Sequence, residues 1–197
     1  RDKKIWDCGE FYRKQQGAYP VIYITFKDVK FDNWKDSLEA IRLVIRDEYM
    51  RHADILSWDG LDVVEKDYLD RMQKGTLSNV EYTRALLNLS RMLEKYHNKK
   101  IVVLIDEYDT PIQQGHSKGF YNEVITFMRN FMSGGLKDNP ALAFGVLTGI
   151  LRVSKENLFS GLNNLVVNSV LDEKYSEYFG FASDEVTAMA AYYGRED

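Results

Sequence analysis

Residues 101–109 read IVVLIDEYD, five apolar residues followed at once by acidic ones. A run of Val, Ile and Leu without polar alternation is typical of a strand that is covered on both faces, as in a parallel sheet between helices. Similar runs occupy residues 21–26 (VIYITF), 142–147 (LAFGVL) and 165–170 (LVVNSV). We therefore predict four strands, the last of them over Leu165–Val170.

Helical patterns separate the predicted strands. Ser78 and Glu81 form a capping-box pattern, and the apolar residues that follow recur at helical spacing. We predict a polar loop after Pro111 and the end of the next helix at Gly134-Gly135. Connections of this length exclude hairpins and favour right-handed crossovers. The chain is thus predicted to be an α/β protein, one domain over residues 1–197, with three α/β/α layers and a mostly parallel sheet.

Composition excludes several classes of protein. The 197 residues carry 26 Lys+Arg and 30 Asp+Glu, a net charge of −4, which argues against a nucleic acid covering the whole surface and leaves local contacts open. Cys8 is the one cysteine, so an internal disulfide is excluded and a reducing, cytoplasmic location is expected. No apolar run approaches the roughly 18 residues that a membrane span needs, and no membrane partner is expected.

Polar side chains follow two of the predicted strands. Asp106 and Glu107 come directly after the strand at 101–105, and Thr148 and Arg152 follow the strand at 142–147. Ligands of open parallel sheets bind beyond the carboxyl ends of the strands. A strand-borne acid suits Mg²⁺ held through water, and a second acid can orient or deprotonate a water molecule. Alternatives remain open for each of these residues. The acids would also suit a helix cap or a turn, Thr148 an ordinary strand end, and Arg152 a surface ion pair.

Several segments resemble one known family. The segment DEYDTPI at 106–112 resembles the Walker B segment of the predicted AAA-ATPase-like family of bacteria and archaea, which are P-loop NTPases. The segments LTGILRVSKENLFSGLNN at 147–164, YSEYFGF at 175–181 and YPVI at 19–22 are similar to the same family. The resemblance covers nearly the whole chain. It implies a P-loop NTPase-like fold that binds and hydrolyses ATP, and members of the family commonly carry a C-terminal nuclease-like domain of the PD-(D/E)XK type.

The resemblance also implies roles for single residues. Asp106 would hold Mg²⁺ through water and Glu107 would act on the attacking water. Thr148 and Arg152 would contact the γ-phosphate. ATP and Mg²⁺ are accordingly the expected cofactors of the full-length protein.

One element of the family pattern is not found in this sequence. The phosphate-binding loop, Walker A, has the pattern G-x-x-x-x-G-K-[ST], and no glycine of this chain is followed by lysine. We therefore expect a fragment that lacks the N-terminal strand and phosphate loop, binds ATP poorly and is inactive as given. In the strand order 5-1-4-3-2 of related ATPases the missing strand is central, which leaves Leu142–Leu147 as an edge. A homodimer or strand-exchanged oligomer that forms near Leu142–Thr148 is the expected consequence.

Two other functions are compatible with the residues. A non-catalytic interaction scaffold with a P-loop-like fold would need no phosphate loop. A nuclease would let Asp106, Glu107 and Asp109 bind a metal directly, but no lysine follows these acids at the (D/E)-x-K spacing.

Overall fold

The structure is a computed structural model. It describes residues 4–137, 139–150, 158, 165–178 and 180–195. The chain divides into two compact units, Arg1–Leu162 and Asn163–Asp197, and each is described by itself. The prediction of one domain over residues 1–197 stays a prediction.

The first unit contains a parallel sheet of three strands in the order β1-β2-β3. The strands are β1 (Val21–Thr25), β2 (Ile101–Asp106) and β3 (Leu142–Leu147). The central strand β2 pairs with both neighbours, in a register that sets Thr25 beside Asp106 and Leu147 beside Ile105. The α/β class and the parallel sheet are confirmed, and the three strands lie on the predicted apolar runs. Among the residues that the structure describes, β3 is an edge strand, as expected.

The helices of the first unit follow the strands in the alternation that the sequence predicts. They are α1 (Lys4–Asp7), α2 (Glu10–Arg13), α3 (Trp34–Arg51), the 3-10 helix η1 (Ala53–Ser57), α4 (Val63–Lys74), α5 (Asn79–Thr83), α6 (Ala85–His97), α7 (Thr110–Lys118) and α8 (Tyr121–Leu136). The predicted capping box opens α5, where the Glu81 backbone N–H donates to Ser78 Oγ at 3.3 Å and the Ser78 N–H donates to Glu81 Oε2 at 2.8 Å.

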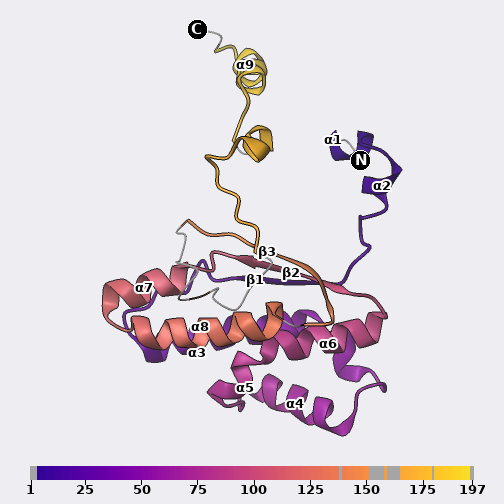
Figure 1. The fold of residues 1–197 in the computed structure, drawn as a ribbon, viewed down its shortest axis with the longest axis vertical. Helices are drawn as coiled ribbons and strands as arrows, with labels where there is room; N and C mark the ends of the chain where they lie inside the picture. Colours follow the sequence, from indigo (N-terminus) through magenta and orange to yellow (C-terminus); the bar gives the residue numbers. More distant parts are fainter. Residues whose placement is uncertain (1–3, 138, 151–157, 159–164, 179, 196–197) are drawn as a thin grey trace. The chain divides into compact units, whose positions relative to one another are not determined.

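One face of the sheet carries the core. Helices α3, α6 and α8 lie along this face (Figure 1), and the strand side chains that point to it, such as Ile22 and Val103, are fully buried. Successive residues of a strand face opposite sides. On the other face Tyr23, Phe144 and Val146 are 47%, 51% and 45% exposed, so the described residues cover this face less completely than the first.

Two segments between β2 and β3 differ from the prediction. The stretch after Pro111 is helix α7 rather than a loop, because proline in the first turn of a helix gives up an N–H that would have no intrahelical partner. Helix α8 continues past Gly134-Gly135 to Leu136. A Cβ at Gly135 would collide with the side chain of Leu86 in α6, so this glycine permits close helix packing rather than ending the helix.

The second unit contains the 3-10 helix η2 (Glu173–Tyr178) and α9 (Ser183–Tyr192). The predicted strand at Leu165–Val170 is wrong: these residues form no strand, and Val166 and Val170 are each 72% exposed. β-branched residues favour a strand only when a neighbouring strand and a buried face are available to them. The run Leu165–Val170 has the composition of a strand, but among the described residues it has neither a neighbouring strand nor a buried face.

Candidate functional site at the carboxyl ends of the strands

Asp106 joins the ends of all three strands. It is the last residue of β2, Thr25 is the last residue of β1, and Thr148 follows β3 directly. The hydroxyl of Thr148 donates to Asp106 Oδ1 at 2.5 Å, and the hydroxyl of Thr25 donates to Asp106 Oδ2 at 3.3 Å. Both oxygens of the carboxylate are therefore held, one from each neighbouring strand.

Glu107 makes the turn from β2 into α7. Its φ is +55°, in the left-handed region that side chains with a Cβ rarely adopt and that costs free energy. The hydroxyl of Thr110, in the first turn of α7, donates to Glu107 Oε2 at 2.8 Å. The positive end of the α7 dipole favours a carboxylate at this place. The turn thus sets a second acid next to Asp106.

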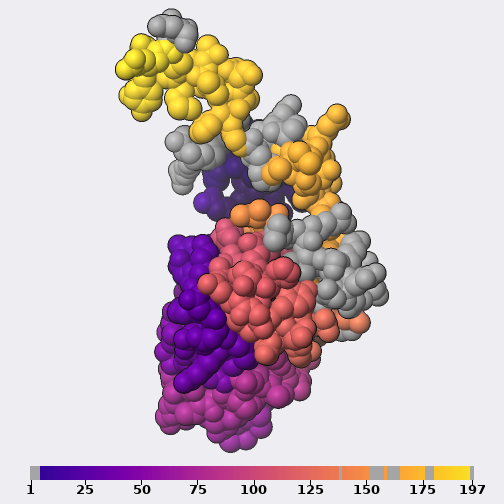
Figure 2. Space-filling model, turned by 90° about the vertical axis from the view of Figure 1, so that its left-hand side faces the viewer, coloured from indigo at the N-terminus to yellow at the C-terminus, as the bar shows by residue number. Residues whose placement is uncertain are grey.

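Helix α7 stands at the surface at this end of the sheet. Figure 2 shows its residues in red beside the indigo residues that lead into α3. Lys118 Nζ lies 2.7 Å from Asp32 Oδ1, and the rings of Trp34 and Phe120 have centroids 6.3 Å apart. These contacts connect the end of α7 and the start of α8 with the start of α3.

Asp109 connects the loop after β2 with the end of β3. Its side chain is fully buried, and Oδ2 accepts from the Ile150 backbone N–H at 3.1 Å and from Gln113 Nε2 at 2.7 Å. A further bond runs from the Tyr108 N–H to the Thr148 carbonyl oxygen at 3.1 Å. The segment 106–109 and the segment 148–150 are therefore bound together at several points.

The described residues suit a magnesium ion that is shared with phosphates. Mg²⁺ takes oxygen ligands, keeps several waters and is usually held by one or two carboxylates plus substrate phosphates. Asp106 offers such a carboxylate. Among the described residues no group of three His, Cys, Asp or Glu could hold a metal by itself. Asp109 is turned to Ile150 and Gln113, which argues against the nuclease arrangement of Asp106, Glu107 and Asp109 around one metal.

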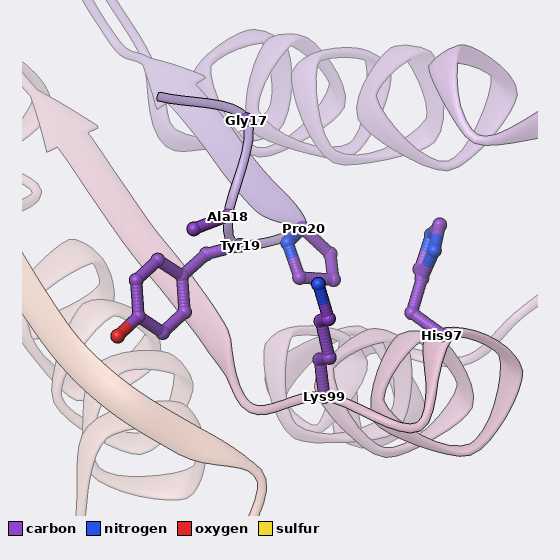
Figure 3. A pocket seen from close by; sticks show the side chains of 6 residues that line it. All are labelled: Gly17, Ala18, Tyr19, Pro20, His97 and Lys99. Carbon is purple, nitrogen blue, oxygen red and sulfur yellow. The ribbon is translucent and has the colours of Figure 1, made fainter. Parts of the chain in front are cut away.

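A cavity of about 220 Å³ lies at the opposite end of the strands. Figure 3 shows Lys99 extending toward Pro20 and His97 beside it, both from the end of α6 and the turn that follows, with Tyr19 on the other side. The backbone bond from the Val102 N–H to the Pro20 carbonyl oxygen, 2.9 Å long, marks the amino ends of β1 and β2. The cavity is thus separate from the acidic site.

The structure brings together three of the four predicted site residues. Asp106, Glu107 and Thr148 lie on neighbouring segments, and Arg152 lies outside the described residues. Sequence reasoning missed Thr25, whose hydroxyl bonds Asp106 across 81 positions of the chain, and it missed that Asp109 binds the end of β3. A threonine that ends a strand next to the acid-bearing strand was the available signal for Thr25.

Comparisons with known proteins give one family and one relative. Residues 4–159 match the family described as "Predicted AAA-ATPase". Over 105 residues the chain is 38% identical to an uncharacterized protein in the vnfD 5′ region of Azotobacter chroococcum mcd 1. The aligned stretch covers 52% of this chain and 20% of that protein. No solved structure is a significant match. No helix in the described part of the chain is long and apolar enough to cross a membrane.

Proposed function

Because the chain belongs to the predicted AAA-ATPase family, we propose that it supplies the acidic end of an ATP-hydrolysing site in the whole protein. One observation carries the proposal. Asp106 and Thr148 lie at the carboxyl ends of neighbouring parallel strands and share a hydrogen bond, with Glu107 next to them. Ligands of parallel sheets bind at this edge.

Asp106 is assigned to Mg²⁺, through water. The hydroxyls of Thr25 and Thr148 orient its carboxylate, and a carboxylate with about four lone-pair sites still has acceptor capacity for the waters of the ion. A bound magnesium ion supplies positive charge that neutralises the phosphates during transfer. Asp106 therefore positions the ion rather than enclosing it.

Glu107 is assigned to the attacking water. Its Oε2 accepts from Thr110, which holds the side chain at the start of α7 and leaves the carboxylate acceptor capacity for a water proton. A carboxylate within hydrogen-bond reach of a water can orient it or accept its proton.

Thr148 and Arg152 are assigned to the γ-phosphate. A threonine hydroxyl has one proton to donate. If Thr148 donates that proton to a phosphate oxygen, it must release Asp106 Oδ1, which it holds at 2.5 Å. The hydroxyl would thereby connect phosphate binding with the orientation of the magnesium-bearing acid. Arg152 would add a charge that a phosphate can accept in two hydrogen bonds.

The phosphate-binding loop is the missing component of this proposal, because the 197 residues contain no G-x-x-x-x-G-K-[ST] sequence. We expect the chain by itself to bind Mg-ATP weakly and to turn it over at a negligible rate. Calorimetric titration of the chain with Mg-ATP measures this, and tight binding would contradict it.

The test of the function uses a longer form of the protein that includes a phosphate loop. Glu107→Gln keeps the size of the side chain and removes the charge. We expect its ATPase rate to fall about 100-fold or more, the usual contribution of an acid–base group. Glu123→Gln, on an exposed position of α8, is the matched control and should keep the wild-type rate. Equal rates for Glu107→Gln and wild type would remove Glu107 from the mechanism.

A non-catalytic interaction scaffold is the second candidate. The lack of a phosphate-loop pattern in these residues and the exposed apolar face at Phe144 and Val146 favour it. The same experiment separates the two functions, since a scaffold would show no Mg-ATP turnover in the longer protein either.

A further inference from the structure

We propose that Asp109 is a positioning residue, whose buried carboxylate holds the end of β3 so that Thr148 reaches Asp106. The meaning of this for catalysis rests on the function proposed above. The geometric part, that Asp109 fixes the segment Thr148–Ile150, can be tested without any turnover.

The position of Asp109 in the chain would suit an ordinary helix cap. It is the N-cap residue of α7, and an aspartate there usually accepts from backbone N–H groups of the first turn. In this structure its side chain makes no such capping bond. Its Oδ2 accepts instead from the Ile150 N–H, 41 positions along the chain, and from Gln113 Nε2. The side chain therefore binds the segment that follows β3 as well as α7.

Burial makes this choice of partners costly to change. The Asp109 side chain is 0% exposed, and a buried carboxylate is tolerated only when it is hydrogen-bonded. The Ile150 N–H and the Gln113 side chain come from two different segments, the end of β3 and the body of α7. The carboxylate therefore links these two segments, because its hydrogen-bond donors come from both of them and replace the water that burial excludes.

Gly149 gives a second, independent sign of the same contact. A Cβ at Gly149 would lie 2.5 Å from Asp109 Oδ1 and 2.9 Å from Tyr108 Cε1. The backbone of Gly149 thus rests directly on the carboxylate and on the neighbouring ring, at a distance that a larger residue would not permit. Glycine is required here for space, because its φ is not in the left-handed region.

Together these contacts fix three successive residues. The Thr148 N–H donates to the Ile105 carbonyl oxygen at 2.9 Å, and the Thr148 carbonyl oxygen accepts from Tyr108. Gly149 rests on Asp109, and the Ile150 N–H donates to it. Without the Asp109 carboxylate, Gly149 and Ile150 would lose these contacts with the segment that follows β2. A displacement of about 1 Å at a site of this kind can cost about 100-fold in rate.

The first arm of the test uses the chain as it is and measures amide hydrogen exchange. Asp109→Ala removes the acceptor, and Gly149→Ala pushes the segment away while Asp109 remains. We expect each to raise the exchange rate of the Ile150 amide about 10-fold, as the loss of one hydrogen bond implies. The Val103 amide in the centre of β2 reports whether the fold is intact. Gly134→Ala, whose Cβ would meet its nearest atom at an ordinary 3.5 Å, is the matched glycine control.

Asp109→Asn is the rescue variant. Its side-chain oxygen, in the place of Oδ2, can still accept from both the Ile150 N–H and Gln113 Nε2. We expect the Ile150 exchange rate of Asp109→Asn to stay close to wild type. The proposal would be overturned if Asp109→Ala left the exchange rate of the Ile150 amide unchanged while the Val103 amide stayed protected. It would also be overturned if the Ile150 amide exchanged as fast in Asp109→Asn as in Asp109→Ala.

The second arm measures ATP hydrolysis in the longer protein. A positioning role predicts that Asp109→Ala lowers kcat about 100-fold with little change in KM, while Asp109→Asn retains most of kcat. A wild type without ATPase activity would refute the proposed function and leave the exchange result to decide the role of Asp109. An active wild type with equal kcat in Asp109→Ala would refute the role of Asp109 in catalysis.

Discussion

The hydroxyl of Thr148 donates to Oδ1 of Asp106 at 2.5 Å, across the ends of two neighbouring strands. This bond forms because β2 and β3 pair in parallel, with Ile105 beside Leu147, so that Asp106 at the end of β2 and Thr148 after β3 meet at one edge. The register of the sheet thus brings the acid and the hydroxyl to the same edge.

Removing this hydroxyl should lower stability slightly. Thr148→Val keeps the shape of the side chain and leaves Asp106 Oδ1 without its donor. Because Thr148 is exposed, water can replace the bond in part, and we expect the free energy of unfolding to fall by about 1 kcal/mol. Urea denaturation measures it. Thr148→Ser retains the hydroxyl and should match wild type, so a serine variant as unstable as the valine variant would show that the methyl group matters instead.

The left-handed turn at Glu107 predicts an unusual order of stabilities. At φ +55° a Cβ costs about 1 kcal/mol, and glycine has no Cβ. Glu107→Gly should therefore be more stable than Glu107→Ala, the reverse of what a residue inside an ordinary helix or strand shows. Both variants lose the bond from Thr110, so the comparison isolates the backbone. Equal midpoints in urea denaturation would argue against strain at this residue.

The sequence predicts the strands and the acids of the site better than their supporting contacts. Asp106, Glu107 and Thr148 follow apolar runs whose composition alone marks them as strands. The roles of Thr25 and Asp109 depend on register across 81 and 41 positions, which no local pattern encodes. The run Leu165–Val170 has the composition of a strand, but it forms none, because strand formation also needs a partner strand and a face to bury.

The outer edge of β1 is closed by side chains of α3. The Tyr23 N–H donates to Glu48 Oε1 at 2.8 Å, and Arg51 Nη2 donates to the Val21 carbonyl oxygen at 2.6 Å. Burial raises the pKa of Glu48, but hydrogen bonds from His52, Arg51 and the Tyr23 N–H outweigh it, so that the pKa lies below its ordinary value of 4.5. The ionised form of Glu48 is therefore the one that stabilises the fold.

This direction sets the pH dependence of the Glu48 contribution. A carboxyl whose pKa is lower in the folded state stabilises the protein above its unfolded pKa, and the contribution disappears as the pH falls through the folded value. Glu48→Gln should cost about 2 kcal/mol near neutral pH, since it removes a buried charged acceptor. The difference from wild type should shrink at pH values below 4.5, the ordinary value for this group. Urea denaturation of both proteins, near neutral pH and again below pH 4.5, measures this difference in the free energy of unfolding. A difference that stays the same at the two pH values would contradict the stabilising role of ionised Glu48.

The edge at β3 is different and should be the place where copies of the chain associate. Phe144 and Val146 are 51% and 45% exposed there, and the strand lies at the end of the order β1-β2-β3. An exposed apolar edge favours pairing with another strand. We propose that the chain forms a homodimer or strand-exchanged oligomer through Leu142–Thr148. Light scattering should then give a mass above the 22.9 kDa of one chain.

A lysine at the edge is the sharpest test of this association. Val146→Lys would place two like charges near each other when two β3 strands pair, and lysine is a residue that protects natural edge strands. We expect it to return the mass to 22.9 kDa. Val64→Lys, at a 72% exposed position of α4, adds the same charge away from the sheet and should leave the oligomer intact. A wild-type chain that is monomeric would contradict the association. An oligomer that survives Val146→Lys but not Val64→Lys would place the contact away from β3.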